Sequence, residues 1–310
     1  MKKIAFIFPG QGSQSIGMGK DFFENSDIAK EMIAKASDRL GFSFEELLFE
    51  ENENLGKTEF TQPAILLVSC IALEIFKSKY TITPQFVLGH SLGEFSALVA
   101  SGAISYLDAV ELVHKRGLFM NEACAGAGAG MMALVGLDDA TVESMTEAQR
   151  AEGKKIWAAN YNMDGQIVVA GIKADLESLA DVYKEAGAKR AIVLDMSVAS
   201  HCELLSSAVE KLNSYLNEFV TDNFETSVIS NVTAEAYNTK DVAIDLLGKQ
   251  LISPVKYKHS ITSKASEVEL FIEFGNGAVL KGLNRKICKE TPTLNVSDMK
   301  SLESTLEALA

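Results

Sequence analysis

The chain has 310 residues, of which 47% are hydrophobic and 23% charged, a composition typical of a folded enzyme and not of a disordered or fibrous protein. Its formal net charge of −13 leaves no basic surplus for binding nucleic-acid phosphates or an anionic membrane. This length predicts one large domain or two unequal ones.

No segment has the pattern of a signal peptide or a membrane span. The apolar run 4–8 is too short for a signal peptide. No stretch approaches the roughly 18 apolar residues of a membrane helix. The four cysteines and four histidines lack the spacings of a metal site. We therefore expect a cytoplasmic protein that has reduced thiols and binds no metal.

Apolar strand patterns alternate with helical patterns along most of the chain. We expect strands at 4–8, 86–88, 227–230 and 270–274, and helices at 21–40, 62–79, 91–100, 105–121, 200–218, 240–251 and 278–288. This order predicts an α/β fold with a mostly parallel sheet, similar to the core of α/β-hydrolases.

A different order of elements lies in the middle of the chain. The small-residue run 123–130 has neither a helical nor a strand period and predicts a flexible connection. After it we expect a βαββαβ sequence, with strands at 131–135, 156–159, 166–170 and 191–194 and helices at 139–151 and 173–186. That is the order of a ferredoxin-like unit. We predict a small ferredoxin-like domain at 126–196, inserted into a large α/β catalytic domain formed by 1–125 and 197–310.

Ser91 is the candidate nucleophile. It lies in Gly89-His90-Ser91-Leu92-Gly93, which fits G-x-S-x-G between an apolar strand and a helix. Ser91 and Glu94 also fit a capping box, so Ser91 could instead only cap the helix. The flanking glycines favour the nucleophile, because a sharp strand-to-helix turn needs residues without Cβ beside the serine.

The chain offers four histidines as a base for Ser91: His90, His114, His201 and His259. His201 is the best candidate, because it follows the carboxyl end of a strand, and open α/β sheets bind their ligands at the carboxyl ends of their strands. A capping box at Ser200 and Glu203 places it at the first helical position, where the helix dipole should keep the imidazole neutral. The alternative is a structural histidine at a helix end. No acid stands in the context of a triad member, so we expect a Ser–His dyad.

Arg116 occupies an apolar position of a helix. The apolar stripe of helix 105–121 runs through Ala109, Leu112, Val113 and Met120, and Arg116 falls on the same stripe. A buried guanidinium needs an anion, and a carboxylate is its natural bidentate partner. That carboxylate could belong to a substrate or to an internal Asp or Glu.

Several motifs together resemble the malonyl-CoA:acyl carrier protein transacylases, an acyltransferase family of fatty-acid synthesis, nearly end to end. They are Phe8 to Gln14 (FPGQGSQ), Gly89 to Glu94 (GHSLGE), Arg116-Gly117 with Met120, Ser197 to Cys202 around His201, and Gln250-Leu251 with Pro254-Val255.

The resemblance implies a role for each candidate. Ser91 would be acylated by malonyl-CoA with His201 as general base, and Arg116 would bind the malonyl carboxylate. The backbone N–H groups of Gln11 and Leu92 would form the oxyanion hole.

Three further positions would complete the site. The main-chain carbonyl of Gln250 would orient His201, and Met120 and Asn160 would line the pocket. The enzyme would transfer the malonyl group to the phosphopantetheine thiol of acyl carrier protein by a ping-pong route, releasing CoA and needing no cofactor. We expect a monomer.

The acidic carrier protein would need a confined basic patch on this acidic chain. The candidates are Lys189, Arg190, Lys281, Arg285 and Lys286, which could also be ordinary solvated charges. Two other functions fit parts of the pattern. A serine thioesterase or hydrolase of neutral acyl chains would have no use for Arg116, and a non-catalytic acyl-binding or scaffold protein would need neither Ser91 nor His201.

Overall fold

The computed structural model describes residues 2–194, 196 and 198–310, so Ser197, from the motif around His201, lies outside the described residues. A six-stranded sheet has the order β10-β9-β1-β2-β7-β8 and is parallel except for the β7–β8 pair. Its strands are β1 (Ile4–Phe8), β2 (Val87–Gly89), β7 (Val228–Ile229), β8 (Ala236–Tyr237), β9 (Leu270–Phe274) and β10 (Thr293–Val296). The sequence prediction of a mostly parallel α/β fold is confirmed.

The central strand β1 shows why the sheet is covered on both faces. All five of its residues are buried. Ile4, Phe6 and Phe8 pack into one hydrophobic core, whereas Ala5 and Ile7 pack into a second core. Successive side chains of a strand point to opposite faces, so a fully apolar strand requires helices on both sides.

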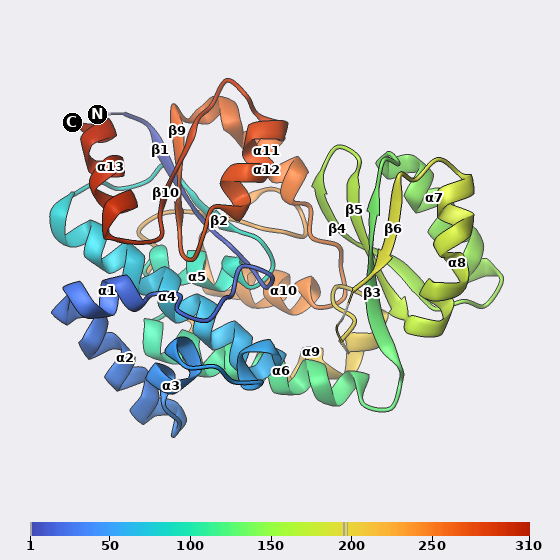
Figure 1. The fold of residues 1–310 in the computed structure, drawn as a ribbon, viewed down its shortest axis with the longest axis horizontal. Helices are drawn as coiled ribbons and strands as arrows, with labels where there is room; N and C mark the ends of the chain where they lie inside the picture. Colours follow the sequence, from blue (N-terminus) through green and yellow to red (C-terminus); the bar gives the residue numbers. More distant parts are fainter. Residues whose placement is uncertain (1, 195, 197) are drawn as a thin grey trace.

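Eleven α-helices of the described chain surround this sheet (Figure 1). They are α1 (Lys20–Asn25), α2 (Asp27–Leu40), α3 (Phe44–Phe49), α4 (Thr58–Lys79), α5 (Gly93–Ala100), α6 (Tyr106–Cys124), α9 (Ser206–Phe219), α10 (Lys240–Gln250), α11 (Tyr257–Lys264), α12 (Val279–Ile287) and α13 (Met299–Leu309). The sequence analysis missed α3, α11, α13, β8 and β10, most of which are short.

Helix α4 is long and apolar enough to cross a membrane, which the sequence analysis did not expect. Its most apolar window has a mean hydropathy of 1.5, but 83% of that window is buried inside the protein. The core helix of a globular protein has this character, because it packs against neighbours on all sides. The apolar character of α4 is therefore explained by its packing against α6 and the sheet.

The second sheet is small and entirely antiparallel. Its order is β4-β5-β3-β6, with β3 (Ala129–Val135), β4 (Ile156–Met163), β5 (Gln166–Ile172) and β6 (Arg190–Val193). Helices α7 (Asp139–Ala151) and α8 (Lys173–Glu185) cover the face that points away from the large sheet (Figure 1). The βαββαβ order and this strand arrangement are those of the predicted ferredoxin-like unit. The predicted connection at 123–130 is shorter than expected, since α6 extends to Cys124 and β3 begins at Ala129.

The predicted helix at 200–218 begins later than expected. A 3₁₀ turn covers Glu203–Leu205 and α9 starts at Ser206. His201 has a φ of 62° and cannot belong to a right-handed helix. His201 is therefore a loop residue between the two sheets.

Candidate active site

Ser91 lies on a sharp turn between β2 and α5. Its φ of 52° is unusual for a residue with a side chain. A Cβ on Gly89 would lie 1.9 Å from the backbone carbon of Gly93, and a Cβ on Gly93 would lie 2.0 Å from the carbonyl oxygen of Phe8. The flanking glycines are therefore required by backbone contact. The Ser91 side chain does not cap α5, so that alternative is wrong.

The Ser91 hydroxyl instead faces His201. Oγ lies 2.8 Å from His201 Nε2, and His201 Nδ1 lies 2.7 Å from the main-chain oxygen of Gln250. A carbonyl can only accept a hydrogen bond, so Nδ1 carries the proton and Nε2 is free to accept one from Ser91. His90 also lines the site, but its Nε2 lies 2.7 Å from Asn162 Oδ1.

Burial keeps the imidazole neutral. His201 is 3% exposed, and burial lowers its pKa to about 3, with the positive charge of Arg116 acting in the same direction. The sequence analysis expected a helix N-terminus to do this, which is wrong because α9 begins five residues later. The ring is thus a neutral base at neutral pH.

Arg116 is buried beside Ser91, and its hydrogen bonds within the described residues go to neutral groups. Its Nη1 donates to Gln62 Oε1 at 2.7 Å, and its Nη2 donates to Gln250 Oε1 at 3.1 Å and to Ser91 Oγ at 3.4 Å. The guanidinium also lies 5.2 Å from the centre of the Phe95 ring. Burial lowers its pKa to about 10, so it remains charged at neutral pH.

No Asp or Glu forms an ion pair with Arg116 in the part of the chain that the structure describes, so its side-chain partners there are neutral. The internal carboxylate partner that the sequence left open is therefore not found among the described residues. The Nε of Arg116 is buried without a hydrogen-bond partner among them. A buried cation with neutral partners favours an anionic ligand.

The two predicted oxyanion donors belong to the same cavity as Ser91. Gln11 and Leu92 both line the cavity that contains Ser91, and neither backbone N–H donates to a hydrogen bond within the described chain. Gln11 Oε1 accepts from Thr58 Oγ1 at 2.9 Å, which holds the glycine loop against α4. A Cβ on Gly10 would lie 2.3 Å from the oxygen of His90, so the loop and the turn touch through their backbones.

The cavity around Ser91 has a volume of ≈ 420 Å³, and its walls come from loops and helices of the large domain and from the antiparallel sheet. Met120 of α6 lies on the large-domain side, and Met131, Asn160 and Val168 come from the small sheet. Met120 and Asn160 thus lie where the sequence predicted them. The antiparallel sheet thus supplies part of the cavity wall.

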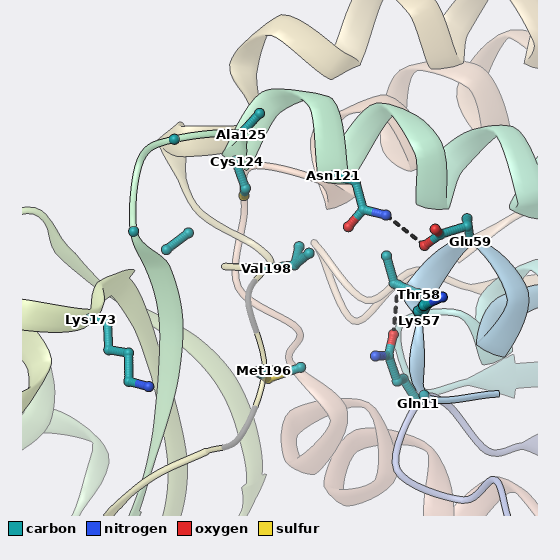
Figure 2. A pocket seen from close by; sticks show the side chains of 14 residues that line it. Gln11, Lys57, Thr58, Glu59, Asn121, Cys124, Ala125, Lys173, Met196 and Val198 are labelled. Atoms are coloured by element: carbon teal, nitrogen blue, oxygen red, sulfur yellow. Dashed lines mark hydrogen bonds between the residues drawn. The ribbon is translucent and has the colours of Figure 1, made fainter. Parts of the chain in front are cut away.

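A second cavity of ≈ 780 Å³ adjoins the first (Figure 2). The two share Gln11, Gly56 and Met196 in their linings. The larger cavity carries Lys57 on the α4 side and Lys173 on the small-domain side. Sequence reasoning missed both lysines, because neither belongs to a motif.

The five predicted docking residues line neither of these two cavities. Lys189 and Arg190 lie at the start of β6, and Met196, which reaches the cavity, follows the other end of that strand. Lys281 and Arg285 line a separate cavity of ≈ 360 Å³ beside α12, and Lys286 is exposed on the same helix. Their role stays a prediction.

Comparison with known proteins identifies the family. The family described as acyl transferase domain matches residues 5–305. The chain belongs to this acyl transferase family. The malonyl CoA-acyl carrier protein transacylase of Bacillus subtilis is 43% identical over 311 residues, covering 100% of this chain and 98% of that protein.

Solved structures of other acyl transferases have the same fold. The malonyl-CoA:acyl carrier protein transacylase of Helicobacter pylori superposes with a TM-score of 0.96 at 43% identity, covering 100% of this chain and 99% of that one. A malonyl-transacylase in complex with its type II PKS acyl-carrier protein superposes with a TM-score of 0.94 at 35% identity, with 99% of each chain covered.

Proposed function

We propose that this acyltransferase moves a malonyl group from malonyl-CoA to the phosphopantetheine thiol of acyl carrier protein through a malonyl-Ser91 intermediate. The named relatives and the carrier-protein complex support this substrate pair. The observation that carries the proposal is the buried Arg116 guanidinium, which lies 3.4 Å from the Ser91 hydroxyl and has no carboxylate partner among the described residues. A malonyl group has its carboxylate one methylene from the carbonyl that Ser91 would attack, so it can reach Arg116.

The geometry accounts for both halves of a ping-pong reaction. Ser91 Oγ attacks the thioester carbonyl while His201 Nε2 takes its proton, and the backbone N–H groups of Gln11 and Leu92 hold the oxyanion. His201 then returns the proton to the leaving CoA thiolate. In the second half, His201 takes the proton of the carrier-protein thiol, whose sulfur attacks the carbonyl of the malonyl-serine ester. The C–O bond to Ser91 breaks, and His201 returns the proton to the Ser91 oxygen. Both halves transfer only protons and an acyl group, so we propose that no cofactor is needed.

The adjoining cavity offers a path for the pantetheine arm of both substrates. It opens onto the Ser91 cavity at Gln11 and Met196. Lys57 and Lys173 are exposed and line this path from opposite walls (Figure 2), and their charges suit the phosphate end of the arm. All residues of the proposed site come from one chain, so we propose that the monomer is the active form.

The decisive test is Arg116→Ala assayed with malonyl-CoA and acetyl-CoA. We expect kcat/KM for malonyl transfer to fall roughly 100-fold or more, because a buried charged hydrogen bond is lost, with a relative gain for acetyl transfer. Arg116→Lys is the matched control, since it keeps the charge but loses the guanidinium fork. Equal losses for both substrates would assign Arg116 a structural part. Mass spectrometry should find the malonyl adduct on Ser91, and its absence would contradict the proposal.

A further inference from the structure

A buried carboxyl group lies directly behind the nucleophile and has no part in the mechanism above. Glu94, in the first turn of α5, is 0% exposed. The sequence analysis assigned it to a capping box, but its Oε2 accepts from the Asn231 N–H at 3.0 Å and from Gln250 Nε2 at 2.7 Å. Its Oε1 accepts from the Tyr237 hydroxyl at 3.1 Å.

The Gln250 side chain connects Glu94 to the rest of the site. Its Nε2 donates to Glu94 and also to the main-chain oxygen of Ser91 at 3.1 Å, while its Oε1 accepts from Arg116 at 3.1 Å. If the amide turned by half a rotation, its NH₂ group would face the guanidinium and its oxygen would face the carboxylate. Both contacts would be repulsive, so the partners allow one orientation only.

Asn231 connects Glu94 to the turn itself. The Asn231 Oδ1 accepts from the backbone N–H of Ser91 at 2.7 Å, and its Nδ2 donates to the oxygen of Gly89 at 2.7 Å. These bonds hold the turn on both sides of a residue in a strained conformation. Asn231 and Gln250 both donate to Glu94 Oε2. This one oxygen atom therefore holds both the residue that bonds the Ser91 turn and the residue that bonds Arg116.

We propose that Glu94 is a positioning residue for acyl transfer: it fixes the Gln250 amide so that Arg116 and the Ser91 turn keep their places. The inference rests on the proposed function, because it concerns the group that selects a carboxylated acyl chain. Its two main partners are an N–H and an NH₂ group, which can only donate. A proton on Oε1 can be given to the Tyr237 oxygen, so a neutral Glu94 keeps the same bonds. This position therefore requires a side chain that is long enough to accept from both donors, and it does not require a negative charge.

Two substitutions distinguish the effect of side-chain length at position 94 from the effect of its charge. Glu94→Gln keeps the reach and, with its NH₂ toward Tyr237, all the bonds, so we expect kcat/KM for malonyl transfer within about threefold of the parent. Glu94→Asp keeps the charge but is one methylene shorter and cannot hold Asn231 and Gln250 together. We expect malonyl transfer to fall roughly 30- to 100-fold, because misplacement of about 1 Å has this effect. Acetyl transfer uses the Ser91 turn but not Arg116, so it should also fall, but by less than malonyl transfer, and the ratio of malonyl to acetyl transfer should decrease.

A matched control is Glu273→Asp. Glu273 is an equally buried acid that accepts from the backbone N–H groups of Leu280 and Lys281 at 2.9 and 2.8 Å, away from the cavity. We expect it to lower the melting temperature without changing the ratio of malonyl to acetyl transfer. A Glu94→Asp enzyme that keeps the parent ratio would overturn the proposal, as would a Glu94→Gln enzyme as impaired as Glu94→Asp.

If Glu94→Asp does not fold, Gln250→Leu provides the same test. It removes the amide but keeps the main-chain carbonyl that holds His201. We expect the same selective loss of malonyl transfer, and an unchanged ratio would overturn the proposal. Failure of the proposed function is distinguishable, because then Ser91 of the parent enzyme would carry no malonyl group. Failure of this inference alone would leave that adduct in place.

Discussion

The two walls of the Ser91 cavity differ in what they contribute. The large-domain wall contains the Ser91 hydroxyl, with the His201 imidazole and the Arg116 guanidinium each within hydrogen-bond reach of it. The small-domain wall contributes mainly Met131 and Val168 and the amides of Asn160 and Asn162. The groups proposed for acid–base chemistry and for anion binding therefore all lie on the large-domain wall, and we expect the small domain to shape the cavity and to exclude water.

The largest effect should come from the large-domain wall. His201→Ala removes the proposed base, so we expect the rate of Ser91 acylation to fall by roughly 10²- to 10⁴-fold. Stopped-flow measurement of CoA release checks this. His114→Ala is the control, because His114 lies outside the cavity and bonds the oxygen of Glu59 through Nδ1. A His201→Ala enzyme with a normal acylation rate would place the base elsewhere.

An intermediate effect should come from the small-domain wall. Val168→Ala should admit water and shorten the lifetime of the malonyl-enzyme about tenfold while leaving acylation nearly unchanged. Val169→Ala is the control on the next position of β5, because its side chain packs into the small-domain core. It should cost roughly 1–3 kcal/mol of stability without changing that lifetime. The adduct lifetime is measured by mass spectrometry after removal of malonyl-CoA, and equal lifetimes for both variants would contradict a sealing role.

A smaller effect is expected from the adjoining cavity. Lys57→Glu and Lys173→Glu should each raise KM for malonyl-CoA several-fold at low salt, and the difference should shrink at high salt, because exposed charges are screened. Lys281→Glu, on a surface away from both cavities, is the control. If Lys281→Glu raises KM as much as the other two, the proposed path of the arm is wrong.

The smallest effect concerns pH. The pKa of His201 is lowered to about 3, so the base should stay unprotonated and the acylation rate should show no loss from His201 between pH 5 and 8. Stability behaves differently, because His201 in the unfolded chain takes up a proton near its ordinary pKa of about 6.5. The unfolded state then binds more protons, so stability should decrease as pH falls below that value. Denaturant titrations at pH 5 and 8 measure the free energy of unfolding of the parent and of His201→Ala, and so show how much of its pH dependence comes from His201.

The sequence predicted the two-sheet fold and singled out Ser91, His201 and Arg116, which the structure brings together at one cavity, because those features depend on local patterns. The strand before Gly89 and the apolar stripe containing Arg116 are visible as short-range periodicity. The partners of Arg116 could not be predicted, because Gln62 and Gln250 come from distant helices. Gln62 could have been noticed in the sequence, because it is a polar residue inside the apolar sequence of α4. The backbone conformation of His201 could also not be predicted, because a left-handed conformation at a residue other than glycine has no reliable sequence pattern.

The loop that contains Gly10 and the turn that contains Ser91 touch through their backbones. Gly10 abuts His90, and Gly93 abuts Phe8, without any intervening side chain. The spacing between the Gln11 and Leu92 amides is therefore a property of the polypeptide backbone, which has the same dimensions whatever the surrounding residues are. Interior side chains could change extensively over evolutionary time while the proposed oxyanion pocket kept its dimensions, provided that Gly10 and Gly93 were retained.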